Sequence, residues 1–215
     1  MISILPLVAM LAFASAGPDS SPNALAARSI AGNTIVSPTN PPLRIRVSKD
    51  LPCVGRLTFR LKDVAEVERF VFARRGEDGR VRALFIAQFE SLLPAAAKGY
   101  TFAIEDSTRL GAHAYQTNTG WFNFAQAAAA KPGFEADQTR KFLSGHGLKV
   151  EGEDFLAARY ARITDATKRN ELILFYYESA TERGMKRTEL ESGGSAAEVF
   201  EAVERRAREQ FEVLE

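Results

Sequence analysis

Apolar and polar residues alternate along much of the chain after residue 42, with the period expected of β-strands. Residues 43–47 (LRIRV) place three apolar side chains on one side and two arginines on the other, and residues 57–61 (LTFRL) have a similar pattern. Such alternation is typical of antiparallel strands that bury one face and leave the other in water. We therefore expect the folded domain to begin near Leu43, with strands.

A β-hairpin is predicted around residues 76–79 (GEDG), which separate two strand-like runs, 66–75 and 80–93. Glycine and aspartate between runs rich in β-branched and aromatic residues favour a hairpin turn. One face of the second run is apolar and carries Val81, Ala83, Phe85, Ala87 and Phe89. The other face is mixed and carries Arg82, Leu84, Ile86, Gln88 and Glu90. Both faces of this strand should therefore be covered. Weaker alternation predicts another strand at 109–117.

Helical signals follow. Residues 122–130 are rich in alanine and end at a Lys-Pro-Gly sequence, which predicts a short helix and its termination. Residues 137–144 predict a second short helix, which His146 and its flanking glycines should terminate. Residues 156–164 and 171–178 then have the character of two strands joined by a polar loop.

The last predicted element is an amphipathic helix. Apolar residues recur there at steps of three or four, with glutamate and arginine between them: Phe200, Val203, Ala207, Phe211 and Leu214. Ser195 and Glu198 fit a capping box at its start. This helix should lay its apolar stripe on the sheet.

The order of these elements predicts the fold class. Strands, two helices, a strand pair and a final helix do not form the βα alternation of a parallel sheet. We expect an α+β protein with a mostly antiparallel twisted sheet, two short helices inserted between strands, and a C-terminal amphipathic helix packed on the sheet.

The segment before residue 43 is predicted to lie outside the folded domain. Residues 1–16 form an apolar stretch without ionisable side chains that ends in Ala-Ser-Ala, which is typical of a signal peptide cleaved near Ala16-Gly17. Residues 17–42 contain five of the nine prolines and no aromatic residue, which predicts a flexible Pro-rich spacer. Residues 43–215 would then form a single α+β domain. An incorrectly assigned start codon or a hydrophobic tail is the alternative to export.

These features predict an exported soluble protein, secreted or periplasmic. The first sixteen residues are shorter than the roughly 20 that span a bilayer, and no second such stretch follows, so no transmembrane segment is expected in the mature chain. In that compartment the single cysteine, Cys53, is expected to be buried and unreactive.

Composition narrows the chemistry further. The formal net charge of the 215 residues is +1, which gives no general attraction to nucleic acid. One cysteine and two histidines exclude disulfide frameworks and the common zinc and iron–sulfur sites. The sequence contains no G-x-S-x-G, P-loop, G-x-G-x-x-G, H-E-x-x-H or EF-hand pattern. We expect no cofactor and no metal.

Two groups of residues remain as candidate sites. His113 lies in a predicted strand and could act as an acid or base with a carboxylate from a neighbouring strand, such as Glu90. Aromatic residues stand among amides and hydroxyls at 115–124, where Tyr115, Trp121 and Phe122 could contact a small apolar ligand or a carbohydrate. A structural histidine and ordinary core packing are the respective alternatives.

The function favoured by these observations is a non-catalytic ligand-binding module. The first alternative is an extracytoplasmic hydrolase that uses His113 with a carboxylate. The second is a subunit of an envelope assembly, with an envelope protein as its partner. That subunit would dock through arginines crowded around the first hairpin: Arg69, Arg74, Arg75, Arg80 and Arg82. Such arginines could instead form a solvated edge, neutralised by nearby carboxylates.

Overall fold

The larger of two antiparallel sheets has seven strands, which form two meanders that meet in its middle. The structure is a computed structural model, and it describes residues 28–102, 107–188 and 196–214. The strands of this sheet, in spatial order, are β4 (Cys53–Leu61), β5 (Ala65–Arg75), β6 (Val81–Leu92), β10 (Asn170–Ser179), β9 (Phe155–Ile163), β8 (His113–Phe122) and β7 (Ser107–Leu110). The junction is the β6–β10 pair, whose register places Phe89 opposite Leu172 and Glu90 opposite Glu171.

The smaller sheet has four strands and is completed by the C-terminal end of the described chain. In spatial order its strands are β1 (Ser29–Ala31), β2 (Thr34–Ser37), β3 (Leu43–Val47) and β11 (Phe211–Leu214). The predicted alternation in β3 is confirmed, because Leu43, Ile45 and Val47 are buried while the two arginines between them are exposed.

Three helices lie in the described ranges: α1 (Phe124–Ala130), α2 (Glu135–Gly145) and α4 (Ala196–Gln210). The side chain of Asn123 accepts a hydrogen bond from the backbone N–H of Gln126 at 3.0 Å and thereby caps α1. Gly133, with φ 81°, turns the chain into α2, and its N–H donates to Asp137 Oδ2 at 2.9 Å. None of the helices in these ranges is long and apolar enough to cross a membrane.

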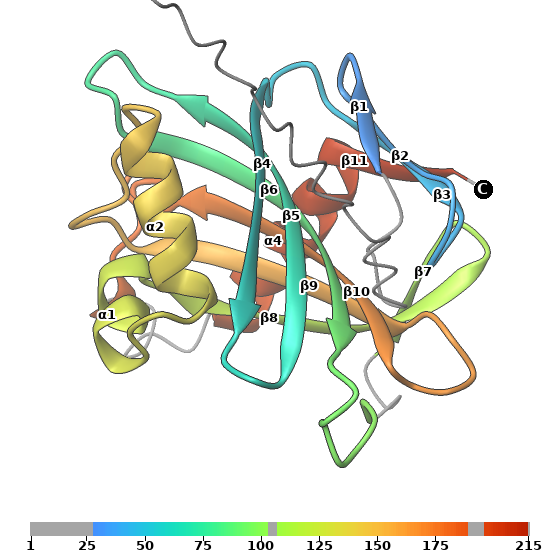
Figure 1. Ribbon diagram of the computed structural model, residues 1–215. Coiled ribbons are helices and arrows are strands. Elements are labelled where there is room, and N and C mark those ends of the chain that lie inside the picture. The colour runs from blue at the N-terminus through green and yellow to red at the C-terminus, as the bar shows by residue number, and fades with distance from the viewer. Residues whose placement is uncertain (1–27, 103–106, 189–195, 215) are drawn as a thin grey trace, which may run out of the picture.

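The seven-stranded sheet is covered on both sides (Figure 1). One side packs against α4 and the four-stranded sheet, and we call it the α4 face. The other side packs against α1 and α2, and we call it the α1–α2 face. Alternate residues of each strand serve the two faces, so Phe85 lies on the α4 face while Leu84 and Ile86 lie on the α1–α2 face. This confirms that β6 is covered on both faces.

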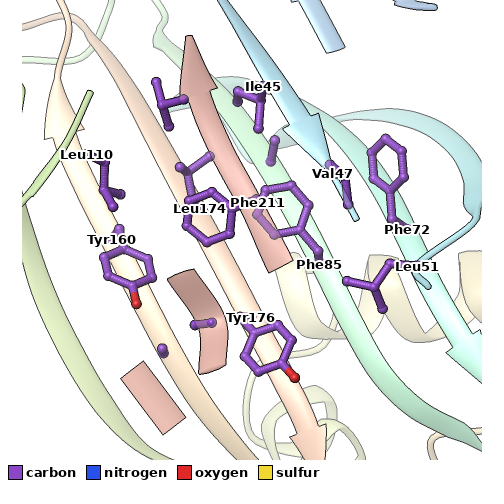
Figure 2. Packing of buried hydrophobic residues seen from close by; sticks show 14 of the residues in the cluster. Ile45, Val47, Leu51, Phe72, Phe85, Leu110, Tyr160, Leu174, Tyr176 and Phe211 are labelled. Carbon is purple, nitrogen blue, oxygen red and sulfur yellow. The ribbon is translucent and has the colours of Figure 1, made fainter. Parts of the chain in front are cut away.

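The core of the α4 face is dominated by large side chains (Figure 2). The ring of Phe211 lies 4.9 Å from that of Phe85 and 5.7 Å from that of Tyr160, measured between ring centroids. Rings at such distances make favourable aromatic pairs in addition to the area they bury. The predicted α+β class, with antiparallel strands and a C-terminal helix packed on the sheet, is confirmed.

The spacer prediction is wrong for the part of the segment that the structure describes. Residues 29–37 form β1 and β2, and Ile35 is completely buried in the core of the α4 face. The short run Thr34–Ser37 is enough to pair with β3, and Pro38, Pro41 and Pro42 lie beyond its end, where they do not interrupt the ladder. The rest of the predicted spacer and the predicted signal peptide at 1–16 lie outside the described residues, so export stays a prediction.

Two further expectations differ from the structure. The last helix ends at Gln210, and Phe211–Leu214 form a strand, so Leu214 does not continue the helical stripe. Phe211 and Val213 instead alternate with exposed Glu212, a period of two that overlaps the helical pattern. Cys53 is exposed rather than buried, at the start of β4 where the pairing with β5 is irregular.

Candidate functional site

A cavity of about 460 Å³ opens between the α1–α2 hairpin and the seven-stranded sheet. Its apolar lining is mainly aromatic and comes from β8, α1, β10 and the turn before α2: Phe122, Phe124, Phe134, Phe175 and Tyr177. Part of this wall is held by ring contacts, since Phe124 lies 4.8 Å from Phe122 and 5.2 Å from Tyr177. The helical hairpin therefore closes only part of the α1–α2 face and leaves a hollow beside it.

The first polar group in this hollow is Arg69, on β5. Its side chain is buried and donates to Gln88 Oε1 at 2.6 Å, to the backbone oxygen of Glu135 at 3.0 Å and to Thr139 Oγ1. Its guanidinium lies 5.6 Å from the ring centre of Phe175. Burial lowers the pKa of Arg69, but an arginine remains charged at neutral pH. Arg69 thus ties β5, β6 and α2 together through its Nε and Nη1 atoms.

The second polar group is Glu90, on β6. Its Oε2 accepts from Gln88 Nε2 at 2.6 Å and its Oε1 accepts from the Tyr100 hydroxyl at 2.7 Å. Burial raises the pKa of Glu90, and the two hydrogen bonds act in the opposite direction. Each oxygen of this carboxyl therefore has a partner within the chain.

The third polar group, Glu171 on β10, differs from the other two. It lies directly opposite Glu90 in the β6–β10 pair, and only 6% of it is exposed. Its Oε2 is buried and has no hydrogen-bond partner in the described structure. Burial and then the neighbouring Glu90 raise the pKa of Glu171 to about 8, against the opposing effect of Arg159. At pH 7, most molecules of the protein therefore hold the Glu171 carboxyl in its neutral, protonated form.

The cavity gathers some of the predicted site residues and separates others. Glu90 and Phe122 line it. Tyr115 and Trp121 point to the α4 face, where Tyr115 is completely buried and Trp121 packs against Phe200 of α4 with ring centroids 6.4 Å apart. Because adjacent residues of a strand point to opposite faces, Trp121 and Phe122 do not share one pocket.

His113 and Glu90 are not brought together. β9 and β10 lie between β8 and β6 in the sheet. His113 alternates with Ala114 and shares the side of Tyr115, on the α4 face, whereas Glu90 lies on the α1–α2 face. The predicted pairing of these two residues as an acid and a base therefore has no support in the geometry.

The arginines of the first hairpin do not lie together in the structure. Arg82 pairs with Asp78 at 3.1 Å and Arg74 pairs with Glu182 at 3.1 Å, both near the surface. Arg69, in contrast, points into the cavity. His146 closes α2 as expected, with its Nδ1 2.8 Å from the backbone oxygen of Phe142.

Sequence reasoning missed Arg159, Glu171 and Tyr177 as site residues, and it placed Arg69 only among the docking arginines of the hairpin. A signal was present in β6, where Gln88 and Glu90 continue a face that begins with Leu84 and Ile86. Polar residues at buried positions of a strand mark a site or a network. Their partners lie on β5, β9 and β10, and no local pattern reveals which residues face them.

The side chains that line the cavity are aromatic, aliphatic and charged. Its lining, within the ranges described, contains no serine, threonine, cysteine or histidine that could serve as a nucleophile. The same ranges hold no cluster of three or more histidine, cysteine or acidic side chains arranged to hold a metal ion. Aromatic walls and a buried carboxyl oxygen remain, which suit a small molecule with an apolar body and a polar end.

Comparisons with known proteins add no assignment. No protein-family model, no curated protein sequence and no solved structure matches this chain.

Proposed function

We propose that this protein is a binding protein for a small amphipathic molecule, held in the cavity between the α1–α2 hairpin and the seven-stranded sheet. The observation that carries the proposal is an aromatic-walled cavity of about 460 Å³ lined by a buried carboxyl group whose Oε2 has no described partner. Ligand cavities in proteins typically measure about 300 to 1,000 Å³ and combine apolar walls with a few polar groups.

The energetics support the same reading. A buried polar atom without a hydrogen bond costs about 1–3 kcal/mol. Both carboxyl oxygens of Glu90, and Nε and Nη1 of Arg69, are paired within the chain. Glu171 Oε2 is buried beside them with no hydrogen-bond partner among the described residues, and a ligand with a hydrogen-bond donor would supply one.

The alternatives have weaker support. A hydrolase that relies on His113 and Glu90 requires residues that lie on opposite faces of the sheet. Docking through the hairpin arginines requires free cations, but Arg74 and Arg82 each contact a carboxylate of this chain. We therefore favour a non-catalytic binding role over both.

A dye-binding experiment tests the proposal. N-phenyl-1-naphthylamine, a small apolar fluorophore, should bind the full chain with one site and gain fluorescence. Ala127, on α1, lines the cavity, so Ala127→Phe should fill part of it and weaken binding by about tenfold or more, equivalent to about 1.4 kcal/mol.

Ala129→Phe is the matched control, because Ala129 lies on the same helix but is exposed and does not line the cavity. It should bind the dye as the wild type does. Equal binding by the wild type and both variants would place the dye elsewhere and contradict the proposal, as would the absence of saturable binding.

A further inference from the structure

The polar end of the cavity carries information about the ligand's charge, and the inference from it rests on the function proposed above. Glu90 and Glu171 are directly opposite each other on β6 and β10, and both are more than nine-tenths buried. Like charges at opposite positions of adjacent strands destabilise a sheet. A positive charge beside Glu90 and Glu171 would therefore stabilise this pair of carboxyl groups.

The cations that the chain itself supplies are mostly committed to other partners. Arg69 donates to Gln88, to Thr139 and to the backbone of Glu135. Arg159, on β9, lines the cavity and acts to lower the pKa of Glu171, but its guanidinium also lies 5.8 Å from the ring centre of Phe102.

The other ionisable groups around Glu171 come from the remaining walls. Glu135 of α2 adds further negative charge, and the Tyr100 hydroxyl donates to Glu90. Lys131, just after α1, is an exposed cation of the lining. Across β6, β10 and α2, the cavity thus gathers three carboxyl groups.

We infer that the cavity binds a small aromatic amine, whose ammonium group donates hydrogen bonds to Glu171 and Glu90 while its ring lies among Phe122, Phe175 and Tyr177. The geometry suits both ends of such a ligand. Among the described residues Glu171 Oε2 has no hydrogen-bond partner, and each oxygen of Glu90 can accept a second hydrogen bond. Aromatic faces also attract a desolvated cation.

Binding of the amine should depend on pH, because its ammonium group replaces the proton on Glu171. An ammonium ion beside Glu171 favours the ionised carboxylate, so binding displaces the proton that Glu171 holds at neutral pH. An alkylammonium group, like that of lysine, stays protonated up to about pH 10. Affinity for the amine should therefore rise between pH 6 and pH 8.

Three probes of one size and different charge test the inference. They are 2-phenylethylamine, 2-phenylethanol and 3-phenylpropionate, each titrated at pH 8 into the full chain loaded with N-phenyl-1-naphthylamine. The amine should displace the dye at a concentration about tenfold lower than the alcohol, and the acid should be the weakest of the three. The preference for amine over alcohol should shrink as the pH falls to 6.

Glu171→Gln keeps the shape of the side chain and removes its charge, so the amine-to-alcohol affinity ratio should fall to about one. Glu66→Gln is the matched control, because Glu66 lies on β5, pairs with Arg60 near the surface and does not line the cavity. It should keep the ratio of the wild type. The pH dependence of the wild-type ratio tests the same point without any substitution.

The outcomes separate the two proposals. If the dye binds but the acid is the strongest competitor, Arg159 governs recognition and the amine inference is wrong. If all three probes compete equally, or if Glu171→Gln keeps the amine preference, the inference is also overturned while the cavity remains a binding site. If the dye does not bind at all, the proposed function fails, and the inference fails with it.

Discussion

The two faces of the seven-stranded sheet each bury a glutamate, but the groups that surround its carboxyl differ between the faces. On the α4 face, Glu68 lies 2.7 Å from the guanidinium of Arg28 and 2.6 Å from that of Arg56. On the α1–α2 face, Glu171 lies opposite another carboxyl and forms no ion pair with any residue of the described ranges. A buried carboxylate with its own cations forms a closed ion-pair network, whereas Glu171, which is mostly protonated at pH 7, lines a cavity.

The surroundings differ in the same sense. Glu68 is embedded beside a continuous core of large side chains, and Arg28 also lies 3.9 Å from the ring centre of Phe89. Glu178, another buried carboxyl on that face, is held by Arg206 of α4 and by Arg183 at 3.0 Å. The α4 face therefore stabilises the fold, whereas the α1–α2 face is less completely packed because it contains the cavity.

The largest expected effect tests the structural role of Glu68. Glu68→Gln should lower the free energy of unfolding by about 3–5 kcal/mol, because Arg28 would remain buried without its anionic partner. Urea titration at pH 7 measures this change. A change below about 1 kcal/mol would mean that the two faces do not differ in the way described.

A slightly smaller effect is expected in the apolar core. Phe211→Ala should cost about 3 kcal/mol, because the ring is buried against Phe85 and Tyr160 and its removal leaves a cavity. Glu209→Ala, at an exposed position of α4, should change stability by less than about 0.5 kcal/mol. Small and equal effects in denaturant titrations would show that β11 and α4 are not docked on the sheet.

A third effect, which is the smallest when expressed per pH unit, has a distinctive sign and concerns Glu171. Its pKa is about 8 in the folded protein and near the ordinary value of 4.5 in the unfolded chain, so the folded state holds an extra proton between these pH values. The free energy of unfolding should then fall as pH rises through that window, by up to about 1.4 kcal/mol per pH unit. Glu90, whose pKa is also raised, adds a slope of the same sign.

Glu171→Gln removes this contribution. The variant should match the wild type near pH 5 and become progressively more stable than the wild type toward pH 8, as measured by urea titrations across that range. A difference that stays constant with pH, or that grows in the opposite direction, would show that the folded protein does not hold an extra proton on Glu171.

The sequence predicts the local parts of this fold well, because they depend on neighbouring residues. Alternation in β3, the glycines at the β5–β6 turn and the Lys-Pro-Gly stop after α1 each act within a few positions. β1 and β2 were missed because prolines nearby suggest a spacer, although the residues of the strands themselves are compatible with a ladder. The sequence pattern places Phe211 in the last helix, although it lies in β11. Residues 211–214 fit both the helical spacing of three to four residues and the strand spacing of two.

The site was predicted only in fragments, for a physical reason. Glu90 and Phe122 were singled out, but the pairing of Glu90 with Glu171 depends on how the two meanders meet, and those residues are far apart along the chain. Trp121 and Tyr115 were grouped with Phe122 because they are close in sequence, yet a strand sends neighbours to opposite faces. Which residues line the site therefore depends on the pairing register of strands that are far apart in the sequence.

The pairing of β11 with β3 also has a consequence during synthesis. Arg46 and Glu212, which pair across these strands, are 166 positions apart. At 5–20 residues per second, roughly 8 to 33 s pass between their translation. Phe211 and Val213 are among the last buried side chains to be made, so the nascent chain carries the aromatic α4 face uncovered until then. Ribosome-associated chaperones that recognise apolar strands would have that interval in which to act.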